Sequence, residues 1–188
     1  MITECHPYHF LLPLFRKENA TFSLSKYVYT PDSLFDDREF FEIEARDFSE
    51  NRVIHEIASL RPDQELALHS KVRVNGKTFH IPMIDFSIEN AVGVDVFDRM
   101  SRYLPKSLML NMAVYSSGRS FHAYSTTLLG PKDWYDFMGR LLLVNPRAQP
   151  GIVDSRWIGH RLIGGFGSLR WSNNSGMYLG LPSRIAFP

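Results

Sequence analysis

The sequence predicts a mixed α/β (α+β) fold in a single domain. Short apolar runs with the alternation of strands are interspersed with segments whose apolar residues recur at helical spacing. A length of 188 residues suits one domain, and 44% hydrophobic with 22% charged residues is an ordinary globular composition.

The first elements predicted with good local signals are a strand and a helix. Residues 40–48 alternate in character for much of their length, which is typical of a strand. Ser49 then provides an N-cap for a helix with an apolar stripe, and Pro62 lies just past its end.

A hairpin follows this helix. Residues 66–74 and 78–86 are strand-like, and Asn75-Gly76 between them readily adopts the positive φ angles of a tight turn. The hairpin is expected to bring Asp85 to a strand end.

The rest of the chain continues to alternate helix and strand signals, with proline residues at several boundaries. We predict helices over residues 94–104, 131–143 and 154–162, and strands over residues 108–115, 121–127 and 168–172.

Charge and cysteine usage restrict the function classes. A formal net charge of +1 predicts no strongly basic surface, so any nucleic-acid contact must come from a local site. Cys5 is the single cysteine, which excludes an internal disulfide and a cysteine-rich zinc module. No run approaches the roughly 18 apolar residues that span a bilayer. We therefore expect a cytoplasmic protein without membrane contact.

Two carboxylates follow apolar runs that are typical of buried strands. Asp85 ends the run 81–84, and Asp154 follows residues 152–153. Alternate strand residues share a face, so a second carboxylate beside Asp85 would stand at Ser87, where the chain has a hydroxyl; Glu89 is the next carboxylate on that face. Paired carboxylates hold the divalent cations used in nucleotidyl transfer. Strand closure or helix capping is the alternative role for Asp85.

A polar segment lies between the two aspartates. The hydroxyl and imidazole of Ser120 and His122 donate hydrogen bonds of the kind that phosphate oxygens accept, Arg119 adds a forked cationic donor, and Ser117-Gly118 allows close backbone approach. A structural histidine in a simple hairpin is about equally probable for this segment taken alone.

Three arginines further along are candidates to contact phosphate: Arg170, then Arg161, then Arg156. Any of them is equally compatible with a surface position. A Ser120, His122 and Asp154 hydrolase triad is disfavoured because the Gly-x-Ser-x-Gly motif is missing.

In their order and their placement at strand ends, these segments resemble the three sequence motifs of the archaeo-eukaryotic primase superfamily, over about residues 78–175. The resemblance implies a two-lobed primase-polymerase-like fold, with a smaller N-terminal α/β part at residues 1–77 and a part with an RRM-like sheet and the motifs at residues 78–188. It also implies a cleft for a nucleoside triphosphate, magnesium or manganese, and single-stranded or template nucleic acid.

The resemblance also assigns roles to individual residues. Asp85 and Asp154 would be metal ligands, with Glu89 in place of the missing carboxylate. Ser120 and His122 would contact the phosphates. Arg119 and Arg170 would assist, with Ser117 and Arg161 also on the nucleotide.

Two hypotheses follow from the resemblance. The first is a minimal primase-polymerase, a nucleotidyltransferase of nucleic-acid synthesis or DNA replication, with a helicase or other replication protein as a possible partner. The second is a degenerate module that binds nucleotide or nucleic acid without catalysis, and Ser87 motivates it.

Overall fold

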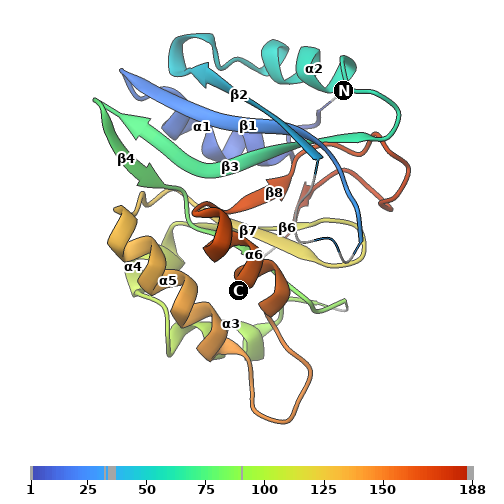
Figure 1. Cartoon of the computed structure of the whole chain (residues 1–188). Helices are drawn as coiled ribbons and strands as arrows, with labels where there is room; N and C mark the ends of the chain where they lie inside the picture. Colours follow the sequence, from blue (N-terminus) through green and yellow to red (C-terminus); the bar gives the residue numbers. More distant parts are fainter. Residues whose placement is uncertain (1, 32, 34–36, 90, 186–188) are drawn as a thin grey trace.

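The computed structural model describes residues 2–31, 33, 37–89 and 91–185 as a mixed α+β structure with two antiparallel sheets (Figure 1). Its strands are β1 (Ala20–Val28), β2 (Asp37–Glu44), β3 (Gln64–Val74), β4 (Lys77–His80), β5 (Met83–Asp85), β6 (Met112–Ser116), β7 (Phe121–Ser125), β8 (Ser168–Arg170) and β9 (Ser183–Arg184). Its helices are α1 (Pro7–Phe15), η1 (Ala45–Asp47), α2 (Glu50–Ala58), α3 (Val94–Ser101), α4 (Lys106–Leu110), α5 (Pro131–Val144) and α6 (Ser155–Gly164).

The first sheet has the strand order β2-β1-β3-β4, and β8 also pairs with β3. β4 and β8 follow one another along the same strand, because β4 pairs with Lys71–Val74 of β3 and β8 pairs with its residues 67–69. β8 thus ties a late segment of the chain to the N-terminal strands.

The two faces of the first sheet differ in chemistry. One face carries apolar side chains such as Phe22, Leu24 and Leu68, all fully buried. Phe15 of α1 packs on this face, where its ring stacks on Phe48 with 4.0 Å between the ring centroids. Burial of a large apolar side chain contributes roughly 1.5–3 kcal/mol. This aromatic cluster therefore fixes α1 to the sheet and leaves the other, polar face available for a site.

The second sheet has the strand order β5-β7-β6-β9. Figure 1 shows α3, α4 and α5 grouped beside this sheet, whereas α1 and α2 lie with the first sheet. Trp134 and Phe137 of α5 are buried and Tyr135 is exposed, which confirms the helical spacing of this segment. The ring of Trp134 stacks on His80, the last residue of β4.

Several predicted elements are confirmed by the structure. Ser49 caps α2 by accepting a hydrogen bond from the backbone nitrogen of Arg52. Asn75 and Gly76 both have positive φ angles, 48° and 76°, in the turn between β3 and β4. The helices predicted over residues 131–143 and 154–162 correspond to α5 and α6.

Other predicted elements need correction. The strand predicted over residues 78–86 is interrupted at Pro82, which has no N–H to donate, and the chain passes from β4 in the first sheet to β5 in the second. The start of the strand predicted over residues 108–115 is helical, because α4 begins after Pro105. The strand predicted over residues 40–48 ends at Glu44, and η1 follows.

Two N-terminal elements were not predicted. α1 contains Pro13 in its interior, which obscured its helical pattern, and β1 is an interior strand of the first sheet. Over the described ranges, no helix is both long and apolar enough to cross a membrane.

Candidate functional site

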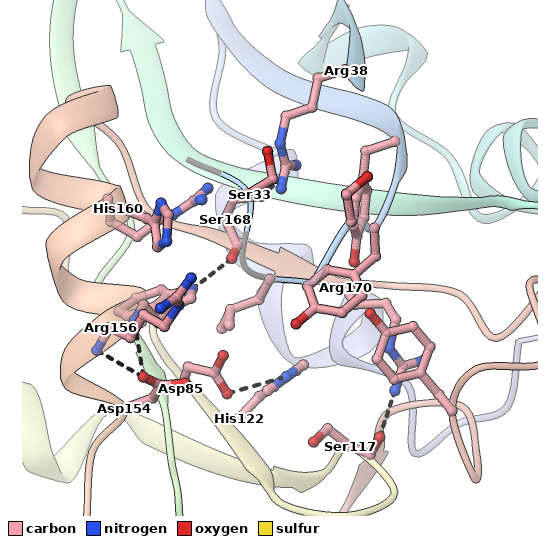
Figure 2. A pocket seen from close by; sticks show the side chains of 17 residues that line it. Ser33, Arg38, Asp85, Ser117, His122, Asp154, Arg156, His160, Ser168 and Arg170 are labelled. Carbon is pink, nitrogen blue, oxygen red and sulfur yellow. Dashed lines mark hydrogen bonds and ion pairs between the residues drawn. The ribbon is translucent and has the colours of Figure 1, made fainter. Parts of the chain in front are cut away.

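A cavity of about 200 Å3 lies between the polar face of the first sheet and the second sheet, with α6 along one side (Figure 2). Seven residues that the sequence analysis singled out line this cavity, and six of them are Asp85, Ser117, His122, Asp154, Arg161 and Arg170. Arg156, the weakest of the three arginine candidates, lines it as well.

The two aspartates lie directly opposite each other on paired backbone segments. Phe86 and Val153 form an antiparallel bridge, and the backbone nitrogen of Asp154 donates to the carbonyl of Asp85 at 2.9 Å. Side chains at such opposed positions have Cβ atoms about 5 Å apart. The fold therefore places two carboxyl groups side by side although they are 69 positions apart in the chain.

Asp154 has a second, local role. Its Oδ1 accepts hydrogen bonds from the backbone nitrogens of Arg156 at 2.8 Å and Trp157 at 2.9 Å, so it is the N-cap of α6. Capping holds the carboxyl group in one orientation at the start of the helix. Both capping bonds use Oδ1, so the cap itself makes no use of Oδ2.

His122 lies next to Asp85 because the two residues are register partners in β7 and β5. The His122 Nε2 atom is 3.7 Å from Asp85 Oδ1 (Figure 2). Burial, with the charge of Arg170 nearby, lowers the pKa of His122 to about 3. The imidazole is therefore neutral at pH 7, and the contact with Asp85 is not an ion pair.

Asp85 is held in an environment that disfavours its charge. Burial and, next, the Asp154 carboxylate raise the pKa of Asp85 to about 8, against the opposing influence of Arg161 and Arg170. Its side chain nevertheless retains 24% exposure, which is directed to the cavity that it lines. A cation that approaches such a carboxyl group favours its ionised form and lowers its pKa.

Ser87 and Glu89 do not add a third ligand to this pair. The Ser87 hydroxyl donates to the carbonyl of Gly151 at 2.6 Å, and its backbone nitrogen donates to Ile152. Glu89 is exposed and does not line the cavity. Ser87 therefore holds the segment that leads to Asp154, a structural role for the residue at the position of the missing carboxylate.

Asn145 completes the support for Asp154. Its side-chain oxygen accepts from the backbone nitrogens of Ile152 and Val153, each at 2.8 Å, and its side-chain nitrogen donates to the carbonyl of Val153. Asn145 was not identified in the sequence, because a loop asparagine gives no local signal of such pairing.

The polar segment between the aspartates is divided by the structure. Ser117 lines the cavity, whereas Arg119 is exposed on the hairpin between β6 and β7 and does not line it. The Ser120 hydroxyl donates to the carbonyl of Phe86 and also lies outside the cavity lining. Of this segment, Ser117 and His122 are the residues brought to the site.

Arg170 is engaged in holding the structure together. Its guanidinium donates to the carbonyls of Ser117, Ser172 and Gly180, and it lies 4.0 Å from the ring centroid of Tyr178. Three backbone acceptors occupy donors that a phosphate would otherwise use. Its charge still acts on the site, as the effects on Asp85 and His122 show.

The first sheet contributes residues that were not identified from sequence. Tyr27 and Arg38 pair in register on β1 and β2, and the Arg38 guanidinium lies 4.3 Å from the Tyr27 ring centroid. Three residues outside the strands of this sheet also line the cavity: Tyr29, just after β1, His160 of α6, and Tyr178, in the segment after β8. His160 has a sequence signal, since it lies four residues after Arg156 on the same helix face; the tyrosines have none.

The fit to a divalent cation is partial. In the part of the chain that the structure describes, no group of three or more His, Cys, Asp or Glu side chains is placed to hold a metal ion. Magnesium is usually bound by one or two carboxylates together with substrate phosphates. Asp85 and Asp154 fit a cation that arrives with a phosphate ligand, and they do not fit a resident metal site.

Comparison with known proteins identifies the family. No curated protein and no solved structure gave a match. The family model described as archaeo-eukaryotic primase 1D-like matches residues 44–183, a region that contains both aspartates, His122 and α6. Because this match covers most of the chain, the protein belongs to the archaeo-eukaryotic primase superfamily.

Proposed function

We propose that the cavity binds a nucleoside triphosphate together with a magnesium or manganese ion. The observation that carries this proposal is the opposed pair Asp85 and Asp154, with His122 beside it, in a cavity that the cationic side chains of Arg156 and Arg161 also line. Carboxylates for a cation and donors for an anion within one small cavity match the two parts of a metal-bound triphosphate.

Asp85 and Asp154 Oδ2 are the groups that would hold the cation, which when bound neutralises phosphate charge. His122 and Ser117 supply neutral donors from the second sheet. Arg156 and Arg161 supply cationic donors from α6. Most of these groups come from paired strands and one helix, so they are positioned before the ligand arrives.

Calorimetry with a nucleoside triphosphate, with and without manganese, tests this function on the wild type and on His122→Ala. We expect manganese-dependent binding that the substitution weakens strongly. Manganese alone is expected to bind poorly, because the protein provides two carboxylates. Tyr135→Ala on the exposed face of α5 is the matched control and should bind as the wild type does. Absence of binding in a folded wild-type protein would refute the proposal.

The second candidate function is template-directed strand synthesis, a primase-polymerase activity with single-stranded nucleic acid and a replication protein as partners. Family membership and the arrival of both motif aspartates at one cavity favour it. Ser87 argues against it, because its hydroxyl binds Gly151 where a third carboxylate would be needed. Between the two functions, the geometry supports nucleotide binding better.

Incorporation assays separate these functions. The binding function predicts no incorporation by the wild type, and the Ser87→Asp variant tests whether one added carboxylate introduces it. Losing one electrostatic contact at a transition state lowers rates by about a hundredfold or more. Incorporation by the wild type that disappears in Asp85→Ala and Asp154→Ala would establish the enzyme instead.

A further inference from the structure

The cavity has an aromatic side that the proposed metal and phosphate contacts do not use. Tyr27, Tyr29 and Tyr178 all line it, two from the end of β1 and one from the segment 173–182 between β8 and β9. We call this segment the strap. Three tyrosines in a cavity of this size mark a surface for a flat, partly apolar ligand group.

Tyr178 is held firmly in place. The Arg170 guanidinium lies 4.0 Å from the centroid of the Tyr178 ring. The start of the strap is fixed by Glu65, which is buried and accepts from the backbone nitrogens of Asn174 and Ser175 at 2.9 and 2.8 Å. The ring is therefore oriented before a ligand binds.

The tyrosines differ in accessibility. Tyr27 is only 6% exposed, with its ring covered by Arg38, so it acts as a support. Tyr29 is 44% exposed. Tyr178 has Arg170 over one face of its ring and is partly exposed between Met177 and Leu179, which are exposed apolar residues. Two accessible rings and two apolar neighbours thus occur around a cavity whose other side is charged.

Tyr27 marks a side of the cavity that lies away from the carboxylates. Figure 2 shows Arg38, which covers Tyr27, at the opposite edge from Asp85 and Asp154. A nucleotide whose phosphates approach the carboxylates would extend toward the tyrosines. Every nucleobase has a π-face that stacks on aromatic rings, with little dependence on which base it is.

We propose that Tyr29 and Tyr178 form a subsite that stacks the base of the bound nucleotide, so that the nucleotide binds without a template and with little preference among the four bases. This inference rests on the proposed function, because it assigns the base of the same ligand. It adds that the protein itself holds the base, a task that strand synthesis leaves to a template.

Calorimetry with manganese tests the subsite by comparing four nucleoside triphosphates with inorganic tripolyphosphate. The four nucleotides should bind the wild type within about threefold of each other. Tripolyphosphate should bind about 10- to 100-fold more weakly, which is the scale of one aromatic stacking contact. In Tyr178→Ala this ratio should fall toward one, while Tyr178→Phe should restore it.

Tyr29→Ala is the second variant, because Tyr29 is exposed and its loss should leave the fold intact; the same fall in the ratio is expected. Equal affinity of the wild type for nucleotide and tripolyphosphate, or an unchanged ratio in both alanine variants, would overturn the subsite and leave the proposed function standing. Strong preference for one base would overturn it too. If no phosphate ligand binds the folded protein, the proposed function fails, and the subsite with it.

Discussion

The two walls of the cavity are built in different ways. The wall from the second sheet and α6 carries Asp85 and Asp154, each at the end of a short apolar segment that is visible in the sequence. The wall from the first sheet carries Tyr27, Arg38 and Arg170, which come from three strands and meet through long-range pairing. Local motifs thus define the chemistry of one wall, whereas sheet register alone defines the other.

Low pH should destabilise the whole fold, both walls included, and this loss of free energy of unfolding is the largest effect expected. Burial lowers the pKa of His69 to about 3, and those of His6 and His80 to about 4, from 6.5. Because these histidines take up protons more readily when unfolded, their contribution to stability is full above pH 6.5 and is lost as the pH falls toward 4. Each contributes on the order of 3 kcal/mol to that loss.

Neighbouring charges act in the same direction for His69 and His80. Arg38 and Arg161 lower the pKa of His69, and Lys71 lowers that of His80. The lowered pKa of His122 acts in the same direction, whereas the raised pKa of Asp85 acts in the opposite direction over this range, as one group against four. Urea unfolding at pH 7, 6, 5 and 4 should show a steep loss of the free energy of unfolding, and a flat profile would contradict these pKa values.

Glu65→Ala should selectively disrupt the wall from the first sheet and lower the free energy of unfolding by about 3 kcal/mol. The Glu65 carboxylate accepts from the Ser172 and Ser175 hydroxyls as well as from two backbone nitrogens of the strap, and hydrogen bonds to a charged group contribute about 1.5–3 kcal/mol each before partial replacement by water. Thermal unfolding measures the loss.

The matched control for that substitution is Glu42→Ala. Glu42 lies in the same sheet and pairs with Arg73 at 2.9 Å, but both side chains are more than half exposed. Exposed ion pairs contribute about 0–1 kcal/mol. Equal effects of the two substitutions would show that the strap is not anchored at Glu65.

The same contrast explains how much could be predicted from sequence. Asp85, His122 and Asp154 were identified because each stands at a strand or helix boundary with a distinct local pattern. Arg170 was identified as a phosphate contact, yet three backbone carbonyls engage it. Its acceptors come from residues up to 53 positions away, and no local pattern contains them.

The mixed α+β class was predicted, but the prediction of individual strands failed for a related reason. α5 and α2 have clear boundary residues and were found, whereas β1 is an interior strand of the first sheet and was not found. The interruption at Pro82 was also missed, although proline gave the signal for it. Whether a strand continues or changes sheets depends on the partner it meets, and a partner distant in the chain leaves no local trace.

Substitutions at Asp154, in the wall from the second sheet and α6, can separate its role as a helix cap from its proposed role as a cation ligand. Asp154→Ala removes the cap and the charge, and should lower the free energy of unfolding by about 1 kcal/mol. Asp154→Asn keeps a capping oxygen and should change stability little. If Asp154 holds the cation, both should weaken manganese-dependent nucleotide binding by about a hundredfold, about 3 kcal/mol. Normal binding by Asp154→Asn would assign Asp154 to capping alone.

Gly118, between β6 and β7, is where the strap contacts the wall from the second sheet. Substitution there should give the smallest of the expected effects on stability and binding. Its φ angle is 109°, and an added Cβ would lie 3.1 Å from the backbone nitrogen of Leu179. Gly118→Ala should therefore destabilise by about 1–2 kcal/mol. Gly139→Ala, in the middle of α5 with open space around it, should instead stabilise by about 1 kcal/mol. Thermal unfolding measures the sign of the stability change for both variants. Because the strap carries Tyr178, only Gly118→Ala should also change nucleotide affinity.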